Sequence, residues 1–394
     1  MVYKFYFIVL SLSTFSLCFS QEKSFMLSDK NATAETKALY QNLKTLSAKG
    51  YLFGHQDDLA YGVNWRYEKG RSDVKDVCGE YPGIYGWDLG GIEKAGSNKN
   101  LDGVPFDKMR LFIKEGYKRG GVITITWHLD NPLSGGNAWD TKTGTVASIL
   151  PGGTKHAVYK SWLNKVAAFI LSLKGSKQEL IPILFRPYHE FTGSWFWWGK
   201  NHCSPDEYKM LWQFTQNYLT QIKKCHNLIY VYNTGTEPAT KAGYLERYPG
   251  NDKVDILSFD NYQGGHPQKD NGFVTGCARL LNIMDSAAIE NNKLTAIAET
   301  GYEAIPYTDW WTDVLQKVVA GHNIAYVLVW RNFGYQQKEK KMHYYAPYKG
   351  QVSEKDFIKF YEAEKTLFEK DAAKENLYKA HGKKILKTGT KKHK

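Results

Sequence analysis

The sequence lacks the short motifs by which metal and phosphate sites are usually recognised. It contains no Cys-x-x-Cys pair, and the segment His189–Gly193 has no second histidine at the spacing of a zinc-protease helix. No glycine-rich loop occurs between Tyr51 and Asp58, where the first predicted strand ends, and this disfavours a dinucleotide-binding fold. We therefore expect no metal ion and no organic cofactor.

Cysteine is also scarce, with five in 394 residues. Without Cys18, which lies in the N-terminal segment, four remain: Cys78, Cys203, Cys225 and Cys277. In an exported protein these could form up to two disulfides, and the sequence leaves the pairing open. Cys203 and Cys225 bracket a predicted helix of about 30 Å, so these two are not expected to bond each other.

Long hydrophobic runs are absent except at the N-terminus. Residues 1–20 are typical of a secretory signal, because Lys4 precedes an apolar run and small residues follow it. The run is short for a bilayer span, so a retained membrane anchor is the weaker alternative. Lipidation of Cys18 is another, although Leu17 stands where a lipobox carries a small residue. We predict a signal peptide over 1–20 and a secreted or periplasmic protein with no stable membrane span.

The net charge of +12 is concentrated in one place, since residues 379–394 carry seven lysines and no acid. We interpret residues 371–394 as a basic, solvated C-terminal tail. Binding of nucleic acid through this tail is the alternative, and no basic motif elsewhere supports it.

Aromatic residues are abundant, with 12 Trp and 27 Tyr, which suits both a large core and a carbohydrate cleft. The length allows one large barrel or two modest domains. Because no interdomain linker or internal repeat is present, we predict one catalytic domain over 21–370, acting as a monomer.

Eight short apolar runs recur along the chain, separated mostly by segments with helical periodicity. The runs are Tyr51–His55, Gly83–Asp88, Val122–His128, Ile181–Tyr188, Leu228–Asn233, Val254–Tyr262, Leu294–Glu299 and Ile324–Trp330. The helical segments include Val158–Leu173, Pro205–Ile222 with a Ser204 cap, Cys277–Ile289 and Asp309–Ala320. Eightfold alternation predicts an α/β fold, a single (β/α)8 TIM barrel, with an open doubly wound sheet as the rival.

Two connections that follow predicted strands are long. Asn131–His156 is rich in glycine and polar residues, and Asn332–Glu354 is basic and rich in tyrosine. In a barrel, loops after strands lie on the face that carries active sites, so these two are expected to form the walls of an open cleft.

The most informative position is Glu190, which follows an apolar run and lies among aromatic residues in Arg186–Gly199. Such surroundings raise the pKa of a carboxyl group, as an acid catalyst requires. Among the other acids at predicted strand ends, Glu299 has small neighbours and ends the seventh strand, across the barrel from Glu190 on the fourth. Paired carboxylates are what glycoside hydrolysis needs.

Several segments together resemble glycoside hydrolase family 26, the β-mannanases, in the clan of barrel glycosidases with catalytic acids on strands four and seven. They are Gly54–Asp58, Tyr85–Asp88, Thr126–His128, Arg186–Gly199, Ala298–Gly301 and Trp330–Asn332. They extend from near residue 50 to about 335, and the His189-Glu190 pair with its Thr-Gly-Ser-Trp-Phe-Trp-Trp-Gly continuation is the most specific.

The resemblance implies a role for each matching residue. Glu190 is the expected general acid/base and Glu299 the expected nucleophile. Tyr262 is expected to donate to Glu299, and His189 to contact the reacting sugar. The remaining expected substrate-binding residues are His128, Trp139, Trp195 and Trp330, with Trp330 beneath the reacting sugar. Trp197 and Trp198 are expected to pack the loop, Asp88 and Arg331 to support the site, and Asp260 to be structural.

The function implied is that of a retaining mannan endo-1,4-β-mannosidase acting on mannan, glucomannan or galactomannan. Related barrel enzymes that cut β-1,3-xylan or mixed-linkage glucan, and a non-catalytic sugar-binding protein, are the alternatives. The sequence does not decide between cleavage within a chain and release from its end, nor tolerance of galactose branches.

Overall fold

Eight parallel strands close into a barrel in the computed structural model, which describes Met1 and residues 27–380. The barrel strands are β1 (Tyr51–Gln56), β4 (Ile84–Asp88), β5 (Val122–Trp127), β6 (Ile183–Pro187), β7 (Leu228–Thr234), β8 (Ile256–Gln263), β9 (Leu294–Tyr302) and β10 (Tyr326–Val329). Each pairs with the next along the chain, and β10 pairs back onto β1 from Leu52↔Tyr326 to His55↔Val329. This closing pair confirms the (β/α)8 barrel and rules out the open sheet.

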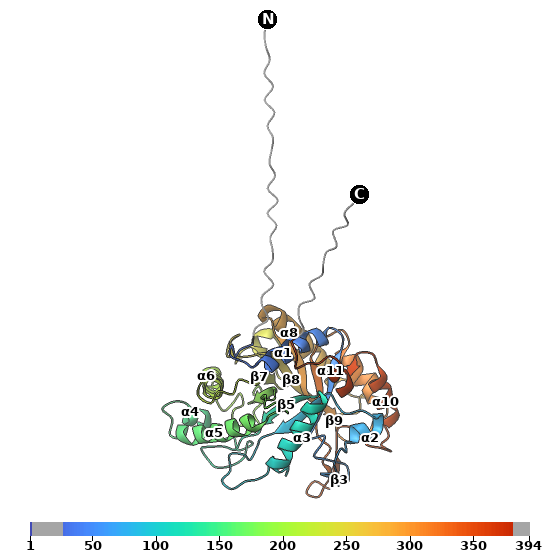
Figure 1. Ribbon diagram of the computed structural model, residues 1–394, viewed down its shortest axis with the longest axis horizontal. Helices are drawn as coiled ribbons and strands as arrows, with labels where there is room; N and C mark the ends of the chain where they lie inside the picture. The colour runs from blue at the N-terminus through green and yellow to red at the C-terminus, as the bar shows by residue number, and fades with distance from the viewer. Residues whose placement is uncertain (2–26, 381–394) are drawn as a thin grey trace.

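All eight predicted strands are present, and their boundaries differ from the prediction by a few residues. Helices lie between them around the outside (Figure 1). They are α1 (Ala34–Ser47), α2 (Asp73–Cys78), α3 (Phe106–Arg119), α4 (Thr145–Ile149), α5 (His156–Ser172), α6 (Pro205–Asn217), α7 (Lys241–Tyr244), α8 (Gly272–Asn291), α9 (Gln316–Val319), α10 (Glu354–Glu362) and α11 (Glu369–Lys374), with π-helical turns η1 (Tyr218–Ile222) and η2 (Trp311–Leu315). The predicted cap of α6 is confirmed, since Ser204 and Glu207 form a capping box before Pro205.

The apolar side chains form two cores because strand residues alternate between the inside and the outside of the barrel. The inner core contains Leu52, Ile84 and Leu184 from the strands together with Leu39 and Leu43 of α1. Helix α1 therefore packs against the N-terminal end of the barrel. Its Tyr40 hydroxyl donates to the Asp255 carbonyl at 2.8 Å, next to the start of β8.

The long loops after β5 and β10 contain small elements of their own. The first holds α4, and the second forms the hairpin β11 (Gly334–Gln336) and β12 (Lys341–His343). A second hairpin, β2 (Tyr61–Gly62) and β3 (Trp65–Arg66), follows β1. Figure 1 places β3 at the end of the molecule opposite α1 and α8. These loops surround the C-terminal ends of the strands, the face on which barrel enzymes carry their sites.

The C-terminal segment is more ordered than predicted. A short strand β13 (Thr366–Leu367) pairs with β1, and α11 follows it. Leu377 is buried, and the Tyr378 hydroxyl donates to the Gly121 carbonyl at 2.7 Å. The predicted boundary at residue 370 is therefore wrong for residues 371–380, which pack on the barrel. The predicted signal peptide over 1–20 and the lysines beyond residue 380 lie outside the described residues.

The four cysteines of the barrel domain are all free thiols, so neither of the two disulfides that the sequence allowed is formed. Burial raises the pKa of Cys225 to about 12, and that of Cys78 to about 12 as well.

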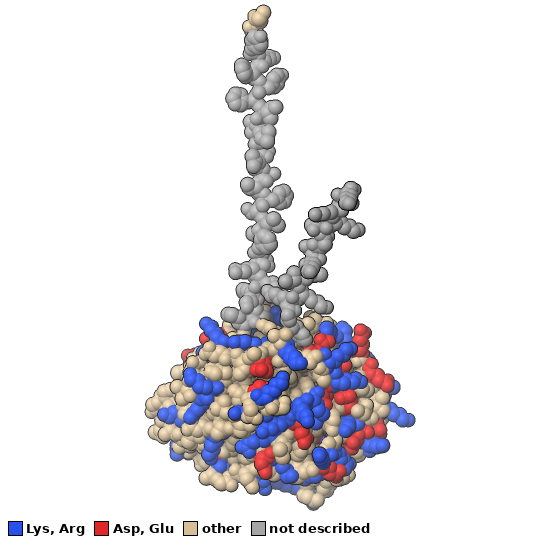
Figure 2. Space-filling view, in the orientation of Figure 1, with Lys and Arg blue, Asp and Glu red and all other residues tan. Residues whose placement is uncertain are grey.

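Figure 2 shows both basic and acidic side chains over the visible face of the folded part. Among the described residues, no helix has the length and apolar character needed to cross a bilayer.

Candidate active site

Three carboxylates meet at the mouth of the barrel. Glu190 lies just after β6, Asp260 in β8 and Glu299 in β9, and one oxygen from each lies within 4.8 Å of the others. The two expected catalytic acids are therefore adjacent. In glycosidases, carboxyl groups about 5–5.5 Å apart go with retention and about 6.5–9.5 Å with inversion. The short gap between Glu190 and Glu299 fits the first class.

A buried arginine supplies the positive charge among these acids. The Arg186 guanidinium donates through Nη1 to Asp260 Oδ2 at 2.7 Å and pairs through Nη2 with Glu299. Three carboxylates this close together could also bind a cation. Here the guanidinium of Arg186 supplies the positive charge that balances them. Asp260 is fully enclosed, and burial raises the pKa of its carboxyl well above the usual range although Arg186 opposes this.

Glu190 has the properties of a proton donor. Burial, and then the charge of Glu299, raise the pKa of Glu190 to about 7. Trp195 Nε1 donates to Glu190 Oε2 at 2.7 Å and opposes part of that rise. The Glu190 backbone lies in the left-handed region at φ 52°, where its N–H donates to Asn233 Oδ1 at 3.1 Å. Strained backbone of this kind is common at active sites.

Glu299 has a different environment, in which both carboxylate oxygens have partners. Its side chain is buried, its Oε1 pairs with Arg186, and its Oε2 accepts the Tyr262 hydroxyl at 2.8 Å. The predicted donation by Tyr262 is therefore observed. The ion pair and the hydroxyl donor each engage one oxygen and fix the orientation of the carboxylate, as a positioned nucleophile requires.

Aromatic side chains line the approach to these acids. Trp139 and Trp195 are 49% and 40% exposed, which is unusual for tryptophan and leaves their faces available to a ligand. The Trp139 ring stacks on His128 at 5.3 Å between centroids, and Trp330 lies 6.4 Å from the same imidazole. Trp197 and Trp198 are fully buried, as packing residues should be.

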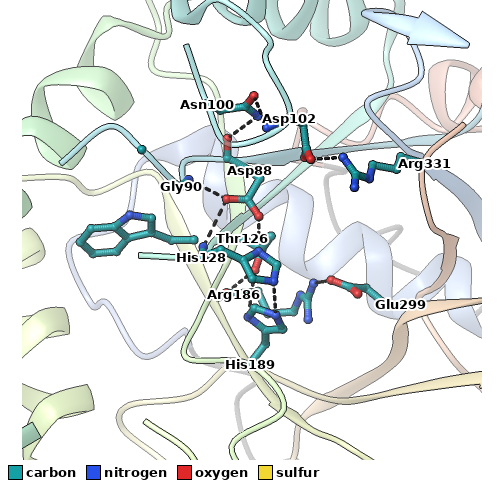
Figure 3. A network of polar contacts seen from close by, with 12 residues as sticks. Asp88, Gly90, Asn100, Asp102, Thr126, His128, Arg186, His189, Glu299 and Arg331 are labelled. Carbon is teal, nitrogen blue, oxygen red and sulfur yellow. Dashed lines mark hydrogen bonds and ion pairs between the residues drawn. The ribbon is translucent and has the colours of Figure 1, made fainter. Parts of the chain in front are cut away.

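His189 lies deeper than the family resemblance suggested. Its Nε2 is 3.0 Å from His128 Nε2, and its Nδ1 is 3.3 Å from Thr126 Oγ1 (Figure 3). Both ring nitrogens are thus engaged by the protein. The structure brings His189 next to the acids but shows no free nitrogen for a sugar.

Sequence reasoning assigned no role to Arg186 or Asn233, two residues that organise the acids. Asn233 accepts from Arg186 and from the Glu190 backbone, and donates to Asp260 Oδ1 at 2.7 Å. A signal existed for both: each polar residue stands at or near the end of a predicted apolar strand, the same criterion that identified Glu299.

The hydrogen bond from Trp195 predicts a shift in pH dependence. In Trp195→Phe the aromatic ring stays, but the donor that lowers the Glu190 pKa is lost. The decline of kcat/KM above pH 7, where Glu190 loses its proton, should then move to higher pH. Profiles on one oligosaccharide would measure this, with Trp162→Phe on α5 as the control. An unmoved alkaline limb would contradict the assigned pKa.

A second acidic cluster lies beside the site. Asp102 forms an ion pair with Arg331, and Asp57 accepts the Tyr61 hydroxyl at 2.6 Å. Burial, followed by the charge of Asp102, raises the pKa of Asp57 well above its usual range. Asp57 Oδ1 and Asp102 Oδ2 have no partner among the described residues, as expected if a carboxyl proton is kept between them.

Asp57→Asn should therefore stabilise the protein at neutral pH. A carboxyl whose folded-state pKa is raised contributes stability below its unfolded pKa and loses it as the pH rises toward the folded value. Asparagine does not titrate, so the melting temperature of the variant should exceed that of wild type by a few degrees at pH 8. In a protein of this size, each kcal/mol of added unfolding free energy raises the melting temperature by about 2 °C. The gain should shrink toward pH 4. Asp102→Asn, which strips Arg331 of its anion, should melt lower at both pH values.

Comparison with known proteins gives a consistent result. The family model described as Glycosyl hydrolase family 26 matches residues 28–387. The solved structure of a GH26 β-mannanase from Bacteroides ovatus is 48% identical with a TM-score of 0.83, covering 88% of this chain and 98% of that one. The catalytic domain of an endo-β-1,4-mannanase from Bacillus sp. JAMB-750 is 32% identical with a TM-score of 0.82, covering 90% and 97%.

A mannan endo-1,4-β-mannosidase from Bifidobacterium adolescentis is 33% identical over 380 residues. The alignment covers 91% of this chain but 36% of that protein. A second relative of the same description, from Thermothelomyces thermophilus, is 28% identical and covered over 53% of its length. The chain thus spans about a third of the first relative and about half of the second.

Proposed function

The chain belongs to glycosyl hydrolase family 26, and we propose that it hydrolyses β-1,4-mannosidic linkages in mannan, glucomannan or galactomannan with retention of configuration. The observation that carries the proposal is the pair Glu190 and Glu299, within 4.8 Å and in contrasting environments. One carboxyl has a raised pKa, and the other is buried against a guanidinium and a phenol.

In the first step, a Glu299 oxygen attacks the anomeric carbon as the bond to the leaving sugar breaks. Glu190 gives its proton to the departing glycosidic oxygen, so that the leaving group departs as a neutral alcohol. The products are a covalent glycosyl-enzyme at Glu299, a shortened sugar and an ionised Glu190. The pKa of about 7 means that much of Glu190 holds this proton near neutral pH.

In the second step, ionised Glu190 takes a proton from water while the water oxygen attacks the same carbon. The bond to Glu299 breaks and its carboxylate is restored. Two inversions leave the β-configuration of the substrate. Loss of charge at Glu299 in the intermediate also removes the repulsion that raised the Glu190 pKa, which suits Glu190 to each role in turn.

The surrounding residues are proposed to bind sugar by their faces. Trp330 follows β10 beside His128 and would form the platform under the reacting unit. Trp195 contacts Glu190 directly and would pack near the cleavage point. Trp139 is half exposed on the loop after β5 and would contact a further sugar. Stacking on such faces is favourable because sugar rings present C–H groups to the aromatic surface.

The test is digestion of linear manno-oligosaccharides with product sizes and anomers followed by NMR. The β-anomer should appear first and convert to the equilibrium mixture afterwards. Initial α-anomer would contradict retention. Release of xylose oligomers from β-1,3-xylan, or of glucose oligomers from mixed-linkage glucan, with mannan untouched would favour the alternative substrates. Binding without turnover would favour a sugar-binding protein.

We also propose export of a monomeric mature chain, secreted or periplasmic, on the basis of the signal-like residues 1–20. Fractionation of expressing cells with N-terminal sequencing is the check. A mature chain that starts near Gln21 in the exported fraction agrees with it, and an intact Met1 in the cytoplasm contradicts it.

A further inference from the structure

A continuous chain of polar contacts leads from β4 to the catalytic face of β6. Asp88 Oδ2 contacts His128 Nδ1, and His128 Nε2 is 3.0 Å from His189 Nε2. His189 Nδ1 is 3.3 Å from Thr126 Oγ1, which donates to the Arg186 carbonyl at 3.0 Å. Figure 3 shows the His128 imidazole between Asp88 and His189, with the guanidinium that pairs with Glu299 beside the two rings.

Counting protons along this chain gives the charge of the histidine pair. A hydroxyl has one hydrogen, and Thr126 gives it to the carbonyl, so His189 must donate to Thr126 from Nδ1. Neutral His189 then accepts at Nε2, and His128 must donate there. A carboxylate only accepts, so His128 also donates from Nδ1 to Asp88. The pair together therefore holds three ring protons and one positive charge.

We propose that Asp88 is a positioning residue that keeps His128 as an imidazolium, thereby fixing the tautomer of His189 and placing one positive charge beside the two catalytic carboxylates. The proposal deepens the function proposed above and rests on the assignment of Glu190 and Glu299 as the reacting pair.

The electrostatics place the charge on His128 and not on His189. Burial lowers the pKa of His128, but the Asp88 carboxylate, together with the charges of Glu299 and Asp102, outweighs burial and the pKa is raised overall. Burial, together with His128 and Arg186, holds the pKa of His189 well below its usual range. The charged groups that face this pair are Asp88, Asp102, Arg186, Glu190 and Glu299.

Asp88 is itself held in place by the loop that follows β4. Its Oδ1 accepts from the Gly90 backbone at 2.6 Å and from the His128 backbone at 3.2 Å. Asn100 Nδ2 donates to the Asp88 carbonyl at 3.1 Å, while its Oδ1 accepts from the Asp102 and Val104 backbones. Burial raises the pKa of this carboxylate, but the charge of His128 and the hydrogen bonds from His128 and from the Gly90 backbone together outweigh burial, so the pKa is lowered overall.

Asp88→Asn separates charge from geometry. The asparagine Oδ1 keeps both backbone contacts, and its amide donates to His128 Nδ1, which then carries no proton. His128 Nε2–H still donates to His189, so the tautomers survive and only the charge is lost. The His128 charge lowers the pKa of Glu190 in the wild type. Its loss should therefore raise the pKa of Glu190.

We expect the alkaline limb of the kcat/KM profile of Asp88→Asn, which reports the loss of the Glu190 proton, to move to higher pH by at least about 0.5 unit, since a unit charge a few ångström away has an effect of that size or larger. The matched control is Asp29→Asn, which removes the anion from a second His–Asp pair, Asp29–His226 at 2.8 Å, at the opposite end of the barrel. Its profile should superimpose on wild type. A profile of Asp88→Asn that also superimposes, or that only falls in height, would overturn the proposal.

Ring ¹⁵N NMR tests the same inference without any substrate, with His128→Gln for assignment. At pH 7.5 His128 should hold protons on both nitrogens in wild type and on one in Asp88→Asn. A neutral His128 in wild type would overturn the proposal even if mannan is hydrolysed. A cationic His128 that becomes neutral in Asp88→Asn, in a protein that does not hydrolyse mannan, would uphold the charge assignment and overturn the proposed function.

Discussion

Replacing Glu299 by alanine is expected to reduce kcat on manno-oligosaccharides by roughly 10⁵- to 10⁶-fold, the scale on which loss of a nucleophile acts in other enzymes. The variant lacks the attacking oxygen. In the wild type, oxygens of Glu190 and Glu299 lie within 4.8 Å of each other, which is closer than the carboxylate separation of enzymes that place a water for direct attack. Steady-state kinetics of the variant and of wild type would measure the loss. Glu179→Gln is the control, because Glu179 lies at the other end of the barrel, where it accepts a hydrogen bond from the Tyr117 hydroxyl.

An added nucleophile distinguishes loss of the attacking group from general damage. In Glu299→Ala, azide can enter where the carboxylate stood and displace a good leaving group once, which gives the α-mannosyl azide. Removal of the Glu299 carboxylate also takes one of the two anions paired with Arg186, so the melting temperature should fall, and folding must be checked in the same preparation. Activity above one hundredth of wild type, without azide, would contradict the nucleophile assignment.

The barrel was predictable because it depends on local patterns. Each buried parallel strand is a short apolar run, such as Val122–Trp127, and longer helices between strands, such as α6, have an amphipathic repeat. The acids at strand ends followed from the fold, since parallel strands bring their C-terminal ends to one face. Glu190 and Glu299 could thus be paired before any distance was known.

The organisation around the acids was not predictable, because it depends on contacts between distant segments. No local pattern shows that Arg186 contacts Asp260 and Glu299, which are 74 and 113 residues away. The left-handed backbone conformation at residue 190 was also not predictable, because the residue there is glutamate and not the glycine that usually indicates such a conformation. Protonation also depends on the folded barrel, because it is set by which charged groups lie next to a buried side chain. Asp57 and the His128–His189 pair are examples.

Glu190→Gln should lower kcat on mannan by about 10²- to 10⁴-fold, the usual contribution of a positioned general acid and base. The loss should depend on the leaving group. An aryl mannoside whose phenol departs without a proton should form the intermediate at Glu299 almost normally, and then hydrolyse slowly, with a burst of phenol. Azide should restore turnover by attacking that intermediate, and should give the β-mannosyl azide, opposite to the product of Glu299→Ala.

The same substitution should stabilise the fold, which separates lost chemistry from misfolding. Burial and Glu299 raise the folded-state pKa of Glu190 to about 7, so the carboxyl gives full stability below its unfolded pKa and loses it as the pH rises to about 7. Glutamine does not ionise, and it can accept from Trp195 as Glu190 does. The inactive variant should therefore melt above wild type at pH 8 and level with it near pH 4. A variant that is inactive but melts lower than wild type at pH 8 would contradict the raised pKa of Glu190, and with it the assignment of Glu190 as the proton donor.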